Sequence, residues 1–150
     1  MKLYNFVHTP RGDRHTPHLI MRIQPTRHTP LVIIDENAGS ITISGVSIPE
    51  NAYIFFRHIE EFIEGLDPEK VKMITFVFRL EYMNTLSSKA FLDYMRMVKD
   101  TKKIGLTVLW EYFSDDEEMH DHGQTFSEIV DIPFQFKSLD PKERVVPGRK

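Results

Sequence analysis

The stretch that most constrains the fold is residues 72–80 (KMITFVFRL), which is apolar at nearly every position. A half-exposed strand alternates apolar and polar residues, whereas a strand that is apolar on both faces is covered on both faces. We therefore predict a central β-strand here, covered by helices on both sides or by a helix and a loop. A strand of this kind is typical of α/β proteins.

The residues before this strand predict a hairpin followed by a helix. Residues 31–34 form a β-rich apolar run, residues 35–39 (DENAG) have the composition of a turn, and residues 40–45 alternate polar and apolar. This pattern is typical of an antiparallel hairpin. Asn51 then stands at a suitable helix start. The apolar residues after it share one helical face, namely Ala52, Phe55, Phe56, Ile59, Phe62, Ile63 and Leu66.

The residues after the central strand predict a parallel crossover. A second helix fits residues 86–103, and a second strand fits residues 106–113. A helix that joins two parallel strands makes a right-handed crossover. A short helix over residues 125–130 and an extended segment over residues 132–136 follow. We therefore expect an α/β domain of order β-β-α-β-α-β-α with a mixed sheet of four to five strands.

The length of 150 residues suits one domain, which we place at residues 28–137. We expect residues 1–27 to form a flexible basic extension, although residues 19–23 (LIMRI) have the composition of a short edge strand. Residues 138–150 contain two prolines and are expected to form a frayed tail. The boundaries thus leave a basic segment on each side of the domain.

The composition narrows the classes of protein to which the chain can belong. There is no cysteine, which excludes disulfides, thiolate nucleophiles and cysteine-ligated metals. No apolar run approaches the roughly 18–20 residues of a spanning helix, and the first residues lack the apolar region of a secretory signal. No glycine-rich phosphate loop or nucleophile elbow is present. We therefore expect a cytoplasmic protein without membrane contact, enzymatic activity or cofactor.

The formal net charge of −3 is unevenly distributed. Residues 1–30 carry +4 and residues 132–150 carry +3, whereas residues 111–131 carry −8. Because the excess of basic charge lies in the two terminal segments, the charge distribution does not indicate a nucleic-acid binder. The acidic segment includes His120, Asp121 and His122. A metal- or ligand-binding module that uses residues 111–131 is therefore the alternative function.

The turn after the central strand, residues 84–88 (NTLSS), is where this architecture places a functional site. In open α/β sheets, sites gather outside the carboxyl ends of the parallel strands. Thr85 falls at the helix N-cap or one residue from it. Its hydroxyl is therefore either a cap, worth about 1 kcal/mol, or a phosphoacceptor at a helix end that tolerates a dianion. The nearby Glu81 would add to the negative charge of a phosphate.

Residues 78–89 (FRLEYMNTLSSK) resemble the hallmark segment of the SiaC family of bacterial regulatory phosphoproteins, long classed as a domain of unknown function. Residues 29–35, 43–56 and 110–118 resemble the same family, as do Phe126, Glu128, Pro133 and Phe134. The resemblance covers about residues 28–136. The central motif is specific because Leu-Glu-Tyr, Asn-Thr and Ser-Ser-Lys occur together at fixed spacing.

The resemblance implies a non-enzymatic switch whose fold is similar to anti-anti-sigma-factor (STAS-like) domains. A Ser/Thr protein kinase would phosphorylate Thr85, and a PP2C-type phosphatase would remove the phosphate. The unphosphorylated form would bind a diguanylate cyclase and promote cyclic-di-GMP synthesis, which favours aggregation and biofilm. The other motif residues are implied as switch-loop and partner contacts, namely Glu81, Tyr82, Asn84, Leu86, Ser87, Ser88 and Lys89.

The sequence departs from the family pattern at Leu86. Members of the family usually carry three hydroxyl residues after Asn-Thr, and Leu86 takes the place of the first. This change leaves Thr85 intact, and we expect it to alter recognition by the kinase.

Overall fold

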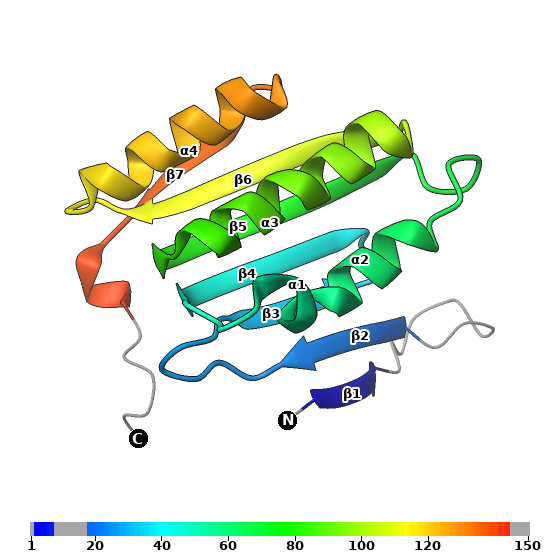
Figure 1. The fold of residues 1–150 in the computed structure, drawn as a ribbon, viewed down its shortest axis with the longest axis horizontal. Helices are drawn as coiled ribbons and strands as arrows, with labels where there is room; N and C mark the ends of the chain where they lie inside the picture. The colour runs from blue at the N-terminus through cyan, green and yellow to red at the C-terminus, as the bar shows by residue number, and fades with distance from the viewer. Residues whose placement is uncertain (1, 8–17, 145–150) are drawn as a thin grey trace.

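The chain folds around one mixed β-sheet, which Figure 1 shows in the computed structural model of residues 2–7 and 18–144. The sheet has seven strands in the order β1-β2-β3-β4-β5-β6-β7. The first four pair antiparallel, and they are β1 (Lys2–Val7), β2 (His18–Ile23), β3 (Leu31–Asp35) and β4 (Ser40–Ser47). The remaining pairs are parallel, and they add β5 (Met73–Met83), β6 (Gly105–Phe113) and β7 (Gln135–Leu139).

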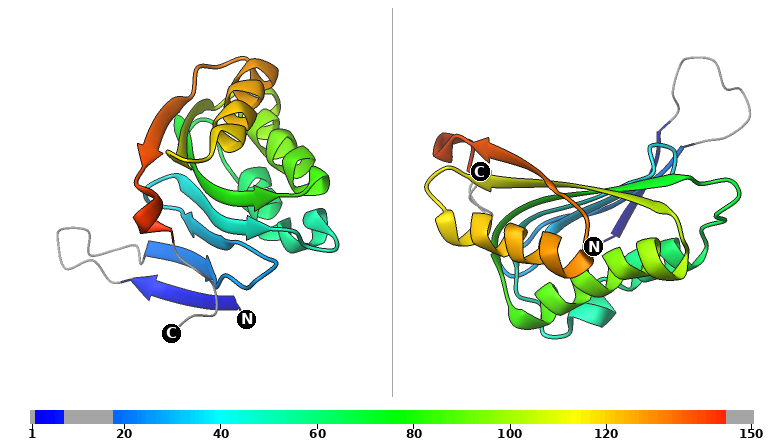
Figure 2. Two further views of the ribbon diagram at one scale, coloured as in Figure 1. Left: turned by 90° about the vertical axis from the view of Figure 1, so that its left-hand side faces the viewer. Right: turned by 90° about the horizontal axis from the view of Figure 1, so that it is seen from above.

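The helices α1 (Ala52–Phe55), α2 (Arg57–Glu64), α3 (Thr85–Arg96) and α4 (Glu117–Val130) cover one face of this sheet, as Figure 2 shows. A π-helix η1 (Met97–Thr101) continues α3, and a 3₁₀-helix η2 (Pro141–Glu143) follows β7. The predicted order β-β-α-β-α-β-α is confirmed from β3 onward, except that the first helix is divided into α1 and α2. Both the hairpin β3–β4 and the parallel pairing of β5 with β6 are confirmed.

Within residues 2–7 and 18–144, helices cover the central strand on one side only, which contradicts the prediction of a cover on both sides. The residues of β5 alternate between two environments. Ile74, Phe76, Phe78 and Leu80 face the helices and are at most 1% exposed. Thr75, Val77 and Arg79 lie on the opposite face, where they are half-buried. Of the last three only Val77 is apolar, so the run of apolar letters overstated how much of this second face is covered.

The largest side chain of the core belongs to Trp110 in β6, which is fully buried. Its ring lies 5.1 Å from that of Phe78 and 5.3 Å from that of Phe126, measured between centroids. The indole N–H donates a hydrogen bond of 3.0 Å to the carbonyl of Met119 in α4. Trp110 therefore joins the sheet to α4, and the expectation that it belongs to the core is confirmed.

The predicted sheet of four to five strands is too small, because β1 and β2 extend it at one edge. They come from residues 1–27, for which we expected a flexible extension, so that expectation is wrong for residues 2–7 and 18–23. The alternative of a short strand over residues 19–23 is confirmed by β2, although β1 and not β2 forms the edge. Met21 pairs with Ile34 and Ile23 with Val32, which continues the buried face of β3. Residues 8–17 of the expected extension lie outside the described residues.

The expected frayed tail is also partly wrong. Residues up to Leu139 belong to β7, and η2 follows immediately. Arg144 then packs over the ring of Phe113, with 4.4 Å from its guanidinium carbon to the ring centroid. Residues 145–150 lie outside the described residues. The domain therefore extends beyond residue 137 at its carboxyl end.

The first helix is interrupted at Phe56, whose backbone angles are φ −93° and ψ 12°. The apolar periodicity conceals this break, because Phe56 and Ile59 remain buried on the same side. The helix predicted for residues 86–103 starts one residue earlier and passes into η1 after Arg96. Within residues 2–7 and 18–144, no helix has both the length and the apolar character to span a bilayer.

Candidate functional site

Three helices begin at the edge of the sheet where β4, β5 and β6 end, which we call the carboxyl edge. Each helix is capped by the side chain of the residue before it, and each side chain accepts a backbone N–H bond three residues on. The caps are Asn51 to Ile54 at 3.2 Å, Asn84 to Ser87 at 2.8 Å and Asp116 to Met119 at 3.0 Å. The carboxyl edge therefore gathers several helix N-termini, which favour negative charge.

The start of α3 is held in place by Asn84. Its backbone N–H donates to the carbonyl of Ser47 at 2.9 Å, and its side-chain amide lies 3.4 Å from the carbonyl of Pro49. The cap of α3 is thus Asn84, and Thr85 is the first helical residue. Of the two positions predicted for Thr85, the structure selects the one beside the cap.

Thr85 is exposed at this position. No hydrogen bond of its hydroxyl group is found within residues 2–7 and 18–144. Because Asn84 supplies the cap, the capping role is not available to explain Thr85. Its side chain therefore presents a hydroxyl group to solvent at the positive end of a helix dipole.

Ser87 differs from the rest of the motif because it is fully buried. Its hydroxyl lies 2.7 Å from the hydroxyl of Ser47 and donates to the Ser47 carbonyl at 3.2 Å. We predicted a partner contact for Ser87, and the structure corrects this. The side chain points inward because Ser87 lies on the same face of α3 as Ala90, Phe91 and Tyr94. Ser87 therefore joins the first turn of α3 to the end of β4 by hydrogen bonds.

Replacing Ser87 by alanine should lower the free energy of unfolding by about 1–3 kcal/mol, because it leaves the buried Ser47 hydroxyl without this partner. Ser88, one residue on, is half-buried, and Ser88→Ala should change stability by no more than about 0.5 kcal/mol. Denaturant unfolding of both variants measures the difference. Equal stabilities of the two variants would contradict the role given to Ser87.

The other motif residues are neighbours of Thr85 in the sequence, and several of them are exposed. Tyr82 is 56% exposed and Leu86 is 39% exposed, so the motif presents two large apolar side chains in addition to the Thr85 hydroxyl. Lys89 is exposed, and Ser88 and Glu81 are half-buried. We call Tyr82, Thr85, Leu86 and Lys89 the switch surface. Such a surface offers apolar contact area together with one hydroxyl group.

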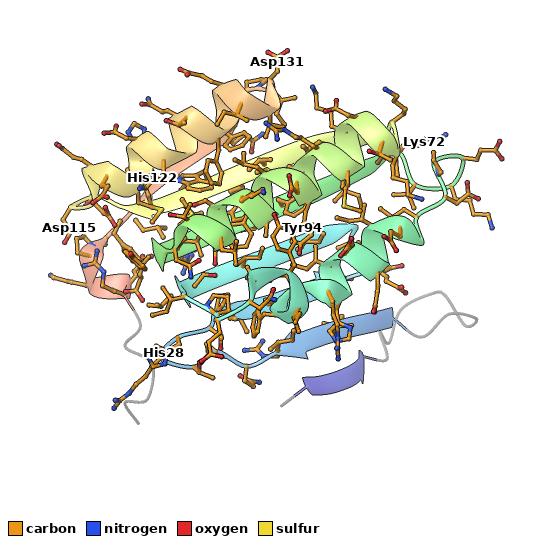
Figure 3. The ribbon with its side chains drawn as sticks, viewed as in Figure 1. His28, Lys72, Tyr94, Asp115, His122 and Asp131 are labelled. Carbon is orange, nitrogen blue, oxygen red and sulfur yellow. The ribbon has the colours of Figure 1, made fainter. Side chains whose placement is uncertain are left out.

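Arg144 connects the chain end to this edge, and sequence analysis did not identify it. Its guanidinium makes two hydrogen bonds to Asp115, at 2.8 Å and 3.2 Å, and lies 3.3 Å from a carboxylate oxygen of Glu81. Figure 3 shows Asp115 and His122 together at this end of the molecule, far from Lys72. Burial raises the pKa of Glu81, and the charge of Arg144 partly offsets that rise. We call this pairing of Arg144 with Asp115 and Glu81 the clamp. Its partners are distant from Arg144 in sequence, so no local sequence pattern predicts it.

Arg144→Gln should change two carboxyl pKa values in the same direction. The hydrogen bonds from Arg144 hold the pKa of Asp115 below its ordinary value of 3.8, so this pKa should rise in the variant. The pKa of Glu81 should rise further above its ordinary value of 4.5. Because the Asp115 pKa is lower in the folded state, its stabilising contribution is present above pH 3.8 and is lost as the pH falls below that value.

Carboxyl titration by NMR measures both pKa values in the wild type and in Arg144→Gln. Lys142→Gln removes a neighbouring exposed charge that makes no ion pair within the described part of the chain, and it serves as the control. If Arg144→Gln and Lys142→Gln give the same Asp115 titration curve, the clamp does not exist in solution.

The acidic segment 111–131 has structural roles in the described chain. Glu111 is buried and pairs with Arg79 at 3.1 Å, and Asp116 caps α4. The ring of His120 packs 4.6 Å from that of Tyr112. His122 lies 3.6 Å from a carboxylate oxygen of Glu118. Among residues 2–7 and 18–144, no three His, Asp or Glu side chains are grouped so that they could hold a metal ion. The metal-binding alternative therefore receives no support from these residues.

Comparisons with known proteins identify relatives of this chain in sequence and in structure. Over 122 residues the chain is 27% identical to an uncharacterised protein of Pseudomonas aeruginosa strain UCBPP-PA14, a match that covers 80% of this chain and 97% of the relative. It is similar to SiaC of Pseudomonas aeruginosa in a crystal structure of the diguanylate cyclase SiaD with SiaC, its activator. There the identity is 25% and the TM-score 0.70, over 79% of this chain and 98% of SiaC.

A further structure of SiaC from Pseudomonas aeruginosa gives 26% identity and a TM-score of 0.64, over 80% of this chain and 98% of SiaC. These comparisons do not test the likeness to STAS domains, which stays a prediction. The family model for SiaC family regulatory phosphoproteins matches residues 23–139, which include Thr85 and the whole switch surface. The chain therefore belongs to the SiaC family of regulatory phosphoproteins.

Proposed function

We propose that this chain is a non-enzymatic regulatory phosphoprotein and that phosphorylation of Thr85 controls its binding to a diguanylate cyclase. The observation that carries the proposal is the position of Thr85, exposed directly after the Asn84 cap. A kinase can reach this hydroxyl without opening the fold. The relative SiaC, crystallised with the cyclase SiaD as its activator, supports the choice of partner class.

Phosphate on Thr85 would change the surface and leave the fold intact. A phosphoryl group adds about −1.5 to −2 charge, which the N-terminus of α3 accommodates. The same charge is added to a surface that exposes the Tyr82 and Leu86 side chains, which a partner of the unphosphorylated form would cover with apolar groups. Glu81 stands at the same edge of the sheet. The modification therefore weakens the binding of a partner and does not destabilise α3.

The enzymes that set this switch would be a Ser/Thr protein kinase and a PP2C-type phosphatase. Leu86 occupies the position directly after Thr85 and is partly exposed, so it lies where a kinase must make contact. Because this residue departs from the hydroxyl found there in the family, we propose that the matching kinase has an apolar contact at this position.

Phosphopeptide mapping of the protein isolated from its own cells tests the proposal. We expect phosphate on Thr85 in one growth state and not in another, and we expect only the unphosphorylated form to co-purify with a diguanylate cyclase. Ser88→Ala should leave the phosphorylation unchanged, whereas Thr85→Ala should abolish it. A protein that carries no phosphate in any state, even with the kinase overproduced, would overturn the proposed switch.

A further inference from the structure

A cavity of about 300 Å³ lies on the face of the sheet that the helices leave uncovered. Its floor is formed by Leu31, Ser44 and Arg79, which are neighbours across three adjacent strands. A volume of this size lies at the lower end of the range found for small-molecule sites, about 300–1,000 Å³. We call it the sheet-face cavity.

Two residues that line this cavity lie outside the residues that match the family model. Arg22 comes from β2, and Glu143 comes from η2. The family model matches residues 23–139, so both residues belong to segments beyond it. The sheet-face cavity therefore combines a floor from the matched range with two charged groups that lie just outside it.

Two of the charged groups that line the sheet-face cavity have no ion-pair partner in the described part of the chain. Arg79 pairs with Glu111 at 3.1 Å, and Glu81 pairs with Arg144 at 3.3 Å, so both groups already have a partner of opposite charge. Within residues 2–7 and 18–144, neither Arg22 nor Glu143 makes an ion pair. One cation and one anion therefore remain available on the lining of the same cavity.

Apolar surface completes the lining. Leu31, Pro25 and Phe113 contribute it, beside the polar groups of Ser44 and Gln24. The Arg144 guanidinium packs on the ring of Phe113, 4.4 Å from its centre, and holds that ring in place. A ligand that matches this lining is small, carries both charges, and has an apolar part.

We propose that the sheet-face cavity binds a zwitterionic amino acid or dipeptide with an apolar side chain. Its carboxylate contacts Arg22, its ammonium group contacts Glu143, and its side chain packs on Pro25 and Leu31. The guanidinium group of Arg22 suits a carboxylate because it can donate two parallel hydrogen bonds. This site is separate from Thr85, and its occupation does not depend on the proposed phosphorylation.

Calorimetric titration of the full chain with leucine and with the dipeptide Ala-Leu tests the proposal. We expect saturable binding of at least one of them with a dissociation constant between about 10 μM and 1 mM. N-acetyl-Ala-Leu and Ala-Leu-amide each lack one of the two charges, and each should bind at least about tenfold more weakly. If neither leucine nor Ala-Leu binds at concentrations up to about 10 mM, the proposal is overturned.

Matched variants locate the site. Arg22→Gln and Glu143→Gln should each weaken binding at least about tenfold. Arg27→Gln and Glu128→Gln remove exposed charges that do not line the cavity, and they should bind as the wild type does. Backbone amide shifts in NMR spectra should change at Leu31, Ser44 and Phe113. Binding that survives both lining substitutions, or shifts confined to the helix face, would show that the ligand binds elsewhere.

Discussion

The Thr85→Glu protein is expected to bind its diguanylate cyclase at least about 100-fold more weakly than the wild type, a loss of about 2.7 kcal/mol. The substitution adds a carboxylate to the surface that also presents Tyr82 and Leu86, which are 56% and 39% exposed. A partner that covers these apolar side chains must then desolvate the added charge. The Glu81 carboxylate at the same sheet edge gives no compensation.

The fold of Thr85→Glu should be unchanged, because acidic residues in the first turn of a helix are favourable. Asn84 remains as the cap of α3, so Thr85→Ala should also retain stability and partner binding. Asn84→Ala, in contrast, should lower the free energy of unfolding by about 1 kcal/mol through loss of the cap. Calorimetric titration with the cyclase and denaturant unfolding measure the two quantities separately.

Thr125→Glu provides the matched control for charge, since Thr125 is exposed in α4 and lies outside the switch surface. This variant should bind the cyclase as the wild type does. If Thr85→Glu binds with unaltered affinity while its stability changes, Thr85 serves the helix and not the partner. The proposed switch would then have to be abandoned.

Gly123→Ala should lower the free energy of unfolding by about 2–3 kcal/mol, even though alanine favours helices by about 1 kcal/mol over glycine. Gly123 lies in α4 directly above Trp110. A Cβ atom there would stand 2.5 Å from the indole nitrogen and 2.8 Å from a ring carbon of Phe136. Trp110 is fully buried, so it cannot move aside without disturbing its aromatic neighbours.

Gly65→Ala is the control, because its Cβ would meet nothing closer than 3.5 Å and its backbone has a φ of −79°. We expect this variant to match the wild type or to be slightly more stable. Urea unfolding monitored by the fluorescence of Trp110, the single tryptophan of the chain, follows both proteins. A Gly123→Ala protein as stable as Gly65→Ala would show that α4 can move away from the sheet without cost.

Local patterns predicted the centre of the domain well. The hairpin turn forms because the Asp35 carboxylate accepts the backbone N–H groups of Asn37 and Ala38, a contact between near neighbours. A helix start at or next to Thr85 was predicted from residues 84–88, because a capping bond such as that between Asn84 and the Ser87 N–H spans only three residues. Signals of this kind lie within a few residues of each other, so the sequence alone carries them.

The outer parts of the sheet were mispredicted because their stabilising contacts are distant in sequence. β2 is short, and its buried face becomes apparent only when Ile23 pairs with Val32. The apolar run of residues 72–80 predicts a strand covered on both faces, because apolar residues alone do not show which side of a strand the helices occupy. Ser87 was read as a surface contact, since its partner Ser47 lies 40 residues away.

By itself, the sequence determined the parallel crossover, the capped start of α3 and the family motif around Thr85, because periodicity, capping and motif spacing are all local properties. Only the tertiary structure decided that Asn84 rather than Thr85 caps the helix and that Ser87 points inward. It also brought Arg144 into hydrogen-bond contact with Asp115, which is 29 residues away in sequence, and within 3.3 Å of the Glu81 carboxylate. Contacts of this kind join segments that are distant in sequence, and the order of the strands in the folded sheet decides which segments become neighbours.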